Sequence, residues 1–117
     1  MAETKNIKVL IVDDESSARD TIADLLTEDG YTDTATESGK NALGLLEQSS
    51  FDLIISDLMM PNMSGIELTK NIKATGTDTP IVVITGFATI EHAVESMKAG
   101  AYDFITKPFN IDQIKLT

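Results

Sequence analysis

The sequence contains no cysteine, which excludes disulfides, thiolate metal ligands and a cysteine nucleophile. Basic residues are scarce, because nine Lys and Arg stand against nineteen Asp and Glu and leave a net charge of −10. A chain this acidic repels phosphate backbones and anionic lipid. We therefore expect no direct binding to nucleic acid or to a membrane surface.

Long hydrophobic runs are also missing: none is long enough for a signal-peptide core or a membrane span. Together with the missing cysteines, this predicts a soluble, unprocessed, cytoplasmic chain. No low-complexity tract, charge block or linker interrupts its 117 residues. That length suits one domain able to bury roughly two-thirds of its unfolded surface, so we expect a single domain over 1–117.

What the sequence does contain is an alternation of short Val- and Ile-rich runs with stretches of helical period. The runs predict strands at 7–12, 32–36, 51–55, 80–84 and 102–106. Strands that alternate with helices form parallel sheets with helices on both faces. The third and fourth runs are almost unbroken, as in central strands, whereas the second and fifth are more polar, as at sheet edges. The prediction is an α/β fold, a doubly wound five-stranded parallel sheet of order 2-1-3-4-5.

The stretches between the strands predict helices over 16–29, 38–48, 64–75 and 89–99. In the last of these, Ile90, Ala93, Val94 and Met97 form an apolar stripe, predicted to face the core, and His92 lies off it on the solvent side. A further helix is expected to begin at Asn110, but so few residues follow that we expect it to be truncated.

Chemically reactive side chains follow four of the five predicted strands. In an open parallel sheet, ligands bind beyond the carboxyl ends of the strands where the strand order reverses, here between the first and third strands. The residues at these strand ends are Asp13, Asp14, Asp57, Thr85 and Lys107. We therefore expect three carboxylates, a hydroxyl and an ammonium to converge on one crevice.

Three neighbouring carboxylates need a counter-charge, because each raises the pKa values of the others. Oxygen ligands without His or Cys favour a hard cation, and we expect Mg²⁺. A metal ion, the Lys107 ammonium and the Thr85 hydroxyl would together bind a tri-oxygen anion beside Asp57. Phosphoryl transfer to Asp57 is the chemistry that this set favours.

At this point the sequence resembles the receiver domains of bacterial two-component response regulators. The matching segments are Val9–Glu15, Asp57–Gly65, Ile84–Gly86 and Gly100–Phe109. The resemblance begins at about Lys8, and 89–109 look most like receivers of nitrogen-regulatory-type activators and some hybrid sensor kinases. It implies a flavodoxin-like fold and a signalling domain that catalyses its own phosphorylation and dephosphorylation.

The resemblance implies a role for each matching residue. Asp57 would accept a phosphoryl group from a phosphohistidine on a sensor histidine kinase or a phosphotransfer protein. Asp14 and Asp57 would ligate Mg²⁺ together with the backbone carbonyl of Met59, and Asp13 would act mainly through bound water.

The resemblance also implies a switch. Lys107 would pair with a phosphoryl oxygen, Thr85 would move towards it, and Phe104 would turn inward behind Thr85. Phe104 lacks the hydroxyl of the Tyr often found there, Gly86 stands where the family often has Ala, and the family has a cis bond before Pro108. The face formed by the helix over 89–99, the fifth strand and the final helix would then bind a partner or form a phosphorylation-dependent dimer.

Three alternatives stay open. A Mg²⁺-dependent phosphatase with an aspartyl nucleophile usually has an acid two residues later, where this chain has Met59. A nucleotide binder would have a first loop rich in Gly and hydroxyls, where this chain has Asp13, Asp14 and Glu15. The third alternative is an interaction module of the same fold that is not phosphorylated.

Overall fold

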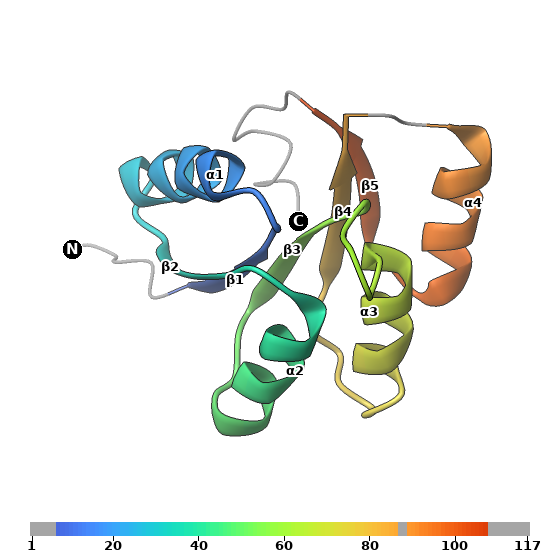
Figure 1. Ribbon diagram of the computed structural model, residues 1–117. Helices are drawn as coiled ribbons and strands as arrows, with labels where there is room; N and C mark the ends of the chain where they lie inside the picture. Colours follow the sequence, from blue (N-terminus) through green and yellow to red (C-terminus); the bar gives the residue numbers. More distant parts are fainter. Residues whose placement is uncertain (1–6, 87–88, 108–117) are drawn as a thin grey trace.

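The computed structural model describes residues 7–86 and 89–107, which form a parallel sheet with helices on both faces (Figure 1). Its elements in chain order are β1 (Lys8–Val12), α1 (Ser16–Glu28), β2 (Thr32–Thr36), α2 (Gly39–Gln48), β3 (Leu53–Asp57), α3 (Gly65–Lys73), β4 (Ile81–Thr85), α4 (Ile90–Ala99) and β5 (Asp103–Thr106). The strand order is β2-β1-β3-β4-β5, as predicted, and every neighbouring pair is parallel.

The predicted division into central and edge strands is confirmed. Every residue of β3 and β4 is buried, whereas β2 and β5 have partly exposed or exposed residues. Central strands are covered on both faces, which explains why their sequences are almost continuously apolar.

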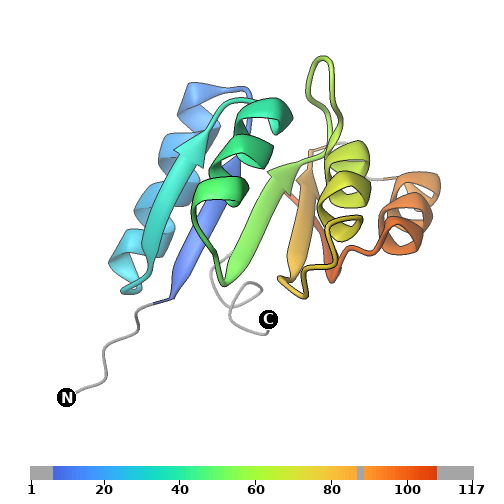
Figure 2. The ribbon, with the colours of Figure 1, turned by 90° about the horizontal axis from the view of Figure 1, so that it is seen from below.

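Two apolar layers lie on opposite faces of the sheet. On one face, Ile22 and Leu26 of α1 pack on Val9, Ile11 and their neighbours from the other strands. On the other face, side chains of α2 and α3 cover residues that alternate with these along the strands. In Figure 1, α1 lies above the strands and α2 below them, and Figure 2 shows the same layers from below.

The ends of the helices follow from local hydrogen bonding. At α3, the Ser64 hydroxyl accepts from Glu67 N at 3.1 Å and the Glu67 carboxylate accepts from Ser64 N at 3.0 Å, which together form a capping box. At α4, the Thr89 hydroxyl accepts from His92 N, and Gly100 ends the helix with φ 110°, a conformation that glycine adopts without strain. Within the described residues, no helix has the length and apolar character needed to cross a bilayer.

The predicted orientation of α4 is wrong. Ile90 is 84% exposed, Val94 45% and Met97 48%, whereas Ser96 is buried and His92 is half-buried. This helix lies at the edge of the sheet, where it contacts α3 and β5. Its small side chains pack inward, and most of its apolar stripe faces outward.

Two other predictions fall on 108–117, outside the described residues. These are the bond before Pro108 and the short helix expected after Asn110.

Gly65, the first residue of α3, lies directly against the end of β3. A Cβ atom at this position would sit 2.5 Å from the Asp57 carbonyl oxygen and 3.1 Å from Leu58 Cα. Both are backbone atoms, so a side chain here would push α3 away from the loop that follows Asp57.

We expect Gly65→Ala to lower the free energy of unfolding by about 1–3 kcal/mol, the usual cost of overpacking. Gly44→Ala is the matched control, because Gly44 lies within α2 and a Cβ atom there would meet nothing within 4 Å. The control should raise the free energy of unfolding by roughly 0.5–1 kcal/mol. Urea unfolding measures both, and a Gly65→Ala variant as stable as the parent would contradict the close contact.

Candidate functional site

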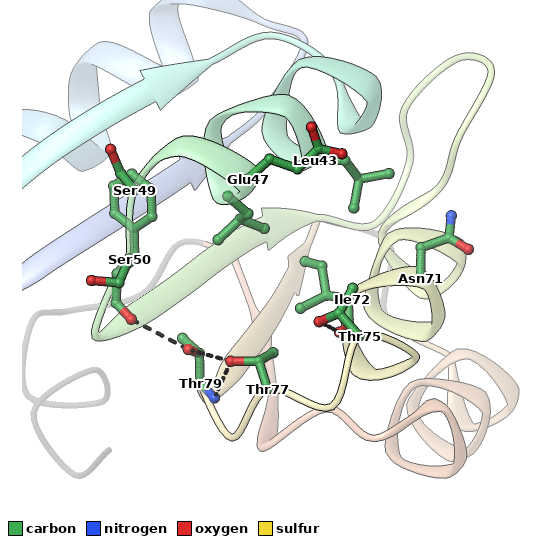
Figure 3. Close-up of a pocket in the computed structure, with 11 residues that line it drawn as sticks. Leu43, Glu47, Ser49, Ser50, Asn71, Ile72, Thr75, Thr77 and Thr79 are labelled. Atoms are coloured by element: carbon green, nitrogen blue, oxygen red, sulfur yellow. Dashed lines mark hydrogen bonds between the residues drawn. The ribbon is translucent and has the colours of Figure 1, made fainter.

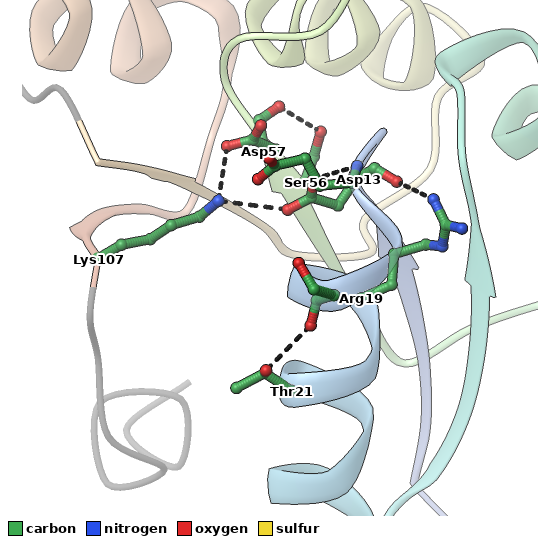
Figure 4. A network of polar contacts seen from close by, with 8 residues as sticks. Asp13, Arg19, Thr21, Ser56, Asp57 and Lys107 are labelled. Carbon is green, nitrogen blue, oxygen red and sulfur yellow. Dashed lines mark hydrogen bonds and ion pairs between the residues drawn. The ribbon is translucent and has the colours of Figure 1, made fainter.

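The reactive side chains predicted from the sequence meet at one edge of the sheet (Figure 4). Asp13 follows β1, Asp57 ends β3, Thr85 ends β4 and Lys107 follows β5. Because the strands are parallel, their carboxyl ends share an edge. Carboxylate oxygens of Asp13, Asp14 and Asp57 all lie within 4.8 Å of one another. The predicted convergence is therefore present.

Lys107 joins the two buried carboxylates. Its Nζ atom lies 3.3 Å from Asp13 Oδ2 and 3.3 Å from Asp57 Oδ1. Asp13 is fully buried and Asp57 is 7% exposed, whereas the Lys107 side chain is 26% exposed. The ammonium thus partly compensates two negative charges and remains accessible from solvent.

Burial and like charges shift the ionisation of this cluster. The pKa of Asp57 is raised above 3.8, first by burial and then by the charge of Asp13, while Lys107 opposes the shift. Burial alone would lower the pKa of Lys107, but its attraction to Asp13 and Asp57 raises it above 10.5. Asp57 is therefore harder to ionise than an ordinary aspartate, and Lys107 holds its proton firmly.

The backbone around the carboxylates is fixed by further hydrogen bonds. Asp13 Oδ1 accepts from Glu15 N at 3.0 Å, which shapes the turn into α1. The Ser56 hydroxyl donates to the Asp57 carbonyl at 3.0 Å. On the neighbouring strand, Thr85 O accepts from Lys107 N at 2.8 Å, which holds Lys107 beside β4.

Arg19 is a residue of this site that the sequence analysis missed. Its Nη1 atom donates to the Asp13 carbonyl at 2.8 Å and so ties the first turn of α1 to the loop after β1 (Figure 4). It is the only arginine in the chain and lies in a predicted helix directly after the acidic loop. That position could have identified it from the sequence as a residue near the site. It contacts the backbone of the site and no reacting atom, so it is a positioning residue.

We expect Arg19→Gln to lower the free energy of unfolding by about 1–2 kcal/mol, at the low end for a hydrogen bond from a charged donor because the group is partly exposed. Freeing the loop should also slow severalfold the phosphoryl uptake that the sequence predicts at Asp57, and Arg19→Lys should recover part of both losses. Lys40→Gln, which removes an exposed cation on α2, is the control. Wild-type unfolding and uptake in Arg19→Gln would show that this bond does not position the loop.

A hollow of about 400 Å³ opens above the carboxylates. The residues that line it are Asp14, Glu15, Asp57, Met59, Thr85, Gly86 and Lys107. Asp14 and Gly86 are exposed, Met59 is 55% exposed, and Thr85 is 1% exposed. A small anion entering this hollow would meet the Asp57 carboxylate and the Lys107 ammonium together.

Phe104 lies behind the site on β5, three residues before Lys107. Its ring is half-buried and packs against the apolar layer that contains Val83 and Leu68. It stands beside Val83 in the β4–β5 register, two residues before Thr85. The structure therefore places Phe104 next to the strand that carries the hydroxyl.

The donor set fits a magnesium ion. The available groups are carboxylate oxygens and nearby carbonyls, with no nitrogen or sulfur ligand among the described residues of the cluster. Hard oxygen donors of this kind suit Mg²⁺, and a cation here would offset both the burial and the neighbouring charge of Asp13 that raise the pKa of Asp57.

Comparison with known proteins places this geometry in a family. Residues 9–117 match the model of the response regulator receiver domain. The regulatory protein AtoC of Escherichia coli K12 is 34% identical over 109 residues, which are 93% of this chain and 24% of AtoC. The transcriptional regulatory protein ZraR of Salmonella typhimurium is 39% identical over 111 residues, 95% of this chain and 25% of ZraR. The chain thus spans about a quarter of the length of these relatives.

Solved structures agree. The chemotaxis protein CheY4 of Vibrio cholerae is 33% identical, with a TM-score of 0.88 over 96% of this chain and 95% of that one. The receiver domain of the Francisella response regulator 1452 is 34% identical, with a TM-score of 0.87 over 95% and 92%. The acidic cluster, the strand order and these matches lead to one conclusion: the chain belongs to the receiver domain family of two-component response regulators.

Proposed function

We propose that residues 1–117 form a single phosphoacceptor domain in which Asp57 receives a phosphoryl group from a histidine kinase or a phosphotransfer protein. The observation that carries this proposal is the contact of Lys107 Nζ with Asp57 Oδ1 at 3.3 Å, at the floor of a hollow open to solvent. Asp57 supplies the nucleophile, and Lys107 supplies a cation for the incoming oxygens.

The transfer balances as a simple displacement. A carboxylate oxygen of Asp57 attacks phosphorus and forms a P–O bond, while the P–N bond to the kinase imidazole breaks. The released imidazole nitrogen keeps the bonding electron pair and is neutral after proton exchange with solvent. The Lys107 ammonium, freed from Asp57, pairs with an oxygen of the phosphoryl group.

Asp13, Asp14, Asp57 and the backbone carbonyl of Met59 are the groups that would hold Mg²⁺. The ion would neutralise charge on the carboxylates and on the phosphoryl oxygens. Asp13, which is fully buried and tied to Glu15 N, is suited to orient this set rather than to reach the solvent side itself.

The proposed switch runs from the hollow to α4 and β5. Thr85 would donate to the phosphoryl group, and Phe104 would repack behind it. Gly86, in the loop after Thr85, lines the hollow. Ile90, Val94, Met97 and Tyr102 give α4 and the start of β5 an exposed apolar surface. We propose that this surface binds the output partner or a second copy after phosphorylation.

The phosphatase alternative gains no support from the geometry. Met59 lines the hollow at the position where such enzymes carry a general acid, and its side chain cannot donate a proton. The hollow therefore supports capture of a phosphoryl group better than rapid hydrolysis.

The test is phosphorylation with acetyl phosphate, followed by intact mass spectrometry. We expect one phosphoryl group per chain in the presence of Mg²⁺, little with EDTA, and its removal by hydroxylamine, which cleaves acyl phosphates. Peptide mapping should place the group on Asp57. An unchanged mass with acetyl phosphate, together with no spectral change with beryllofluoride and Mg²⁺, would overturn the proposal.

A further inference from the structure

A second hollow lies at the opposite end of the sheet from Asp57. It has a volume of about 510 Å³, within the range of small-molecule sites. It lies between the ends of α2 and α3 and the loops that follow them, as Figure 3 shows. Its lining residues are Leu43, Leu46, Glu47, Ser49, Ser50, Phe51, Asn71, Ile72, Thr75, Thr77 and Thr79.

The hollow exists because side chains fill the space between α2 and α3 at one end only. Near their first turns, Met63 packs so closely on Gly39 that a Cβ atom there would lie 2.6 Å from the Met63 sulfur. Near their last turns the chain supplies small residues, such as Ser49, Ser50 and Thr75, which do not fill the space. The apolar side chains left partly accessible are those of Leu43 and Leu46, while Phe51 and Ile72 beneath them are buried in the main core.

The three threonine hydroxyls around this floor have their protons engaged within the protein. The Thr75 hydroxyl donates its proton to Ile72 O at 2.6 Å, and the Thr79 hydroxyl donates to Phe51 O at 3.3 Å. Thr77 Oγ1 accepts from Thr79 N and lies 3.0 Å from Thr79 Oγ1, so its own proton is directed to that oxygen. These protons are used within the protein, and lone pairs remain for a ligand.

The one charged side chain in the lining of the hollow is negative. Glu47 is the only charged residue of its lining, and α2 and α3 both end beside it with their negative dipole ends. Two cations lie behind the lining and are not part of it: the Lys73 ammonium donates to Thr79 O, and the Lys8 ammonium lies 5.4 Å from the centre of the Phe51 ring. A net charge of −10 adds to the same potential.

We propose that this second hollow binds an organic ammonium ion, with an apolar body on Leu43 and Leu46 and a primary ammonium at the rim formed by Glu47 and the threonine hydroxyls. An ammonium offers three donors and no acceptor, which complements the threonine oxygens and the Glu47 carboxylate. An apolar anion would meet the same rim with the wrong sign. The site is separate from Asp57 and does not depend on the proposed phosphorylation.

The test is a titration of the ¹⁵N-labelled chain, followed by amide chemical shifts, with three ligands of matched shape: 2-phenylethylammonium, 2-phenylethanol and 3-phenylpropionate. We expect saturable shifts centred on residues 43–51 and 71–79 with the ammonium, weaker binding of the alcohol, and no saturation with the carboxylate. Glu47→Gln should weaken ammonium binding about two- to fivefold, the range of a partly exposed ion pair, and leave the alcohol unaffected.

Glu28→Gln is the matched control, because it removes the same charge from an exposed position on α1. If Glu47→Gln and Glu28→Gln weaken the binding of the ammonium equally, the whole acidic surface attracts the ligand, and the proposal is overturned. Equal binding of the ammonium and the carboxylate, or shifts centred on the Asp13 loop, would overturn it as well. Because Glu47 is exposed, its replacement should not disturb folding, which the unligated spectrum verifies.

Discussion

Asp57→Asn is expected to take up no phosphoryl group from acetyl phosphate, whereas the parent chain takes up one. The amide keeps the size of the carboxylate but has no charged oxygen to attack phosphorus and no negative charge for Lys107 to face. Because Lys107 Nζ lies 3.3 Å from both Asp13 and Asp57, it keeps one carboxylate partner in the variant. Phosphoryl uptake should therefore be lost completely, as measured by intact mass, while the folded structure should change little, as measured by circular dichroism.

Asp78→Asn is the control. Asp78 is exposed in the loop before β4, and its substitution removes the same charge as Asp57→Asn. It should be phosphorylated at the parental rate. Full phosphorylation of Asp57→Asn would show that another side chain accepts the phosphoryl group and would contradict the proposed role of Asp57.

The same variant should be more stable than the parent when Mg²⁺ is absent. The pKa of Asp57 is raised above 3.8 in the folded state, so folding favours its protonated form. As pH rises from 3.8 through the folded pKa, the parent loses stability because Asp57 must ionise while buried beside Asp13. An asparagine avoids that cost, so the difference in free energy of unfolding should be small in acid and reach a plateau near neutral pH.

The strand ends could be predicted from the sequence, because a parallel sheet leaves little freedom. Once the Val- and Ile-rich runs are strands of order 2-1-3-4-5, their carboxyl ends share one edge, and Asp13, Asp57 and Lys107 must be neighbours. Side-chain contacts within the edge were less predictable. Arg19 reaches Asp13 from α1, and its contact depends on how the loop turns.

The face of α4 could not be predicted from its periodicity. A stripe at helical spacing shows that one side is apolar, but it does not show whether that side meets the core or a partner. Here Ser96 is buried, and Ile90, Val94 and Met97 are largely outside. The second hollow escaped prediction for a related reason, since small residues such as Ser49, Ser50 and Thr75 leave a space only where the fold brings the last turns of α2 and α3 together.

Lys107→Met is expected to lower the free energy of unfolding by about 1–3 kcal/mol at neutral pH without Mg²⁺. Removing one partner of a buried pair leaves uncompensated charge, and the figure is below the usual cost because the ammonium is 26% exposed. Asp13 is fully buried, and Asp57 would then face it with no cation between them. Lys40→Met, an exposed substitution of the same kind on α2, should change little.

The pH dependence of Lys107→Met separates charge from packing. The pKa of Lys107 is raised above 10.5, so its contribution is present at lower pH and is lost as pH rises through the folded pKa. At the acid end the contribution falls again as Asp57 becomes protonated. Parent and variant should therefore differ most near neutral pH. Mg²⁺ should stabilise the variant more than the parent, because a competing positive charge is gone. A difference that is the same at every pH and magnesium concentration would show that Lys107 acts through the packing of its methylene chain.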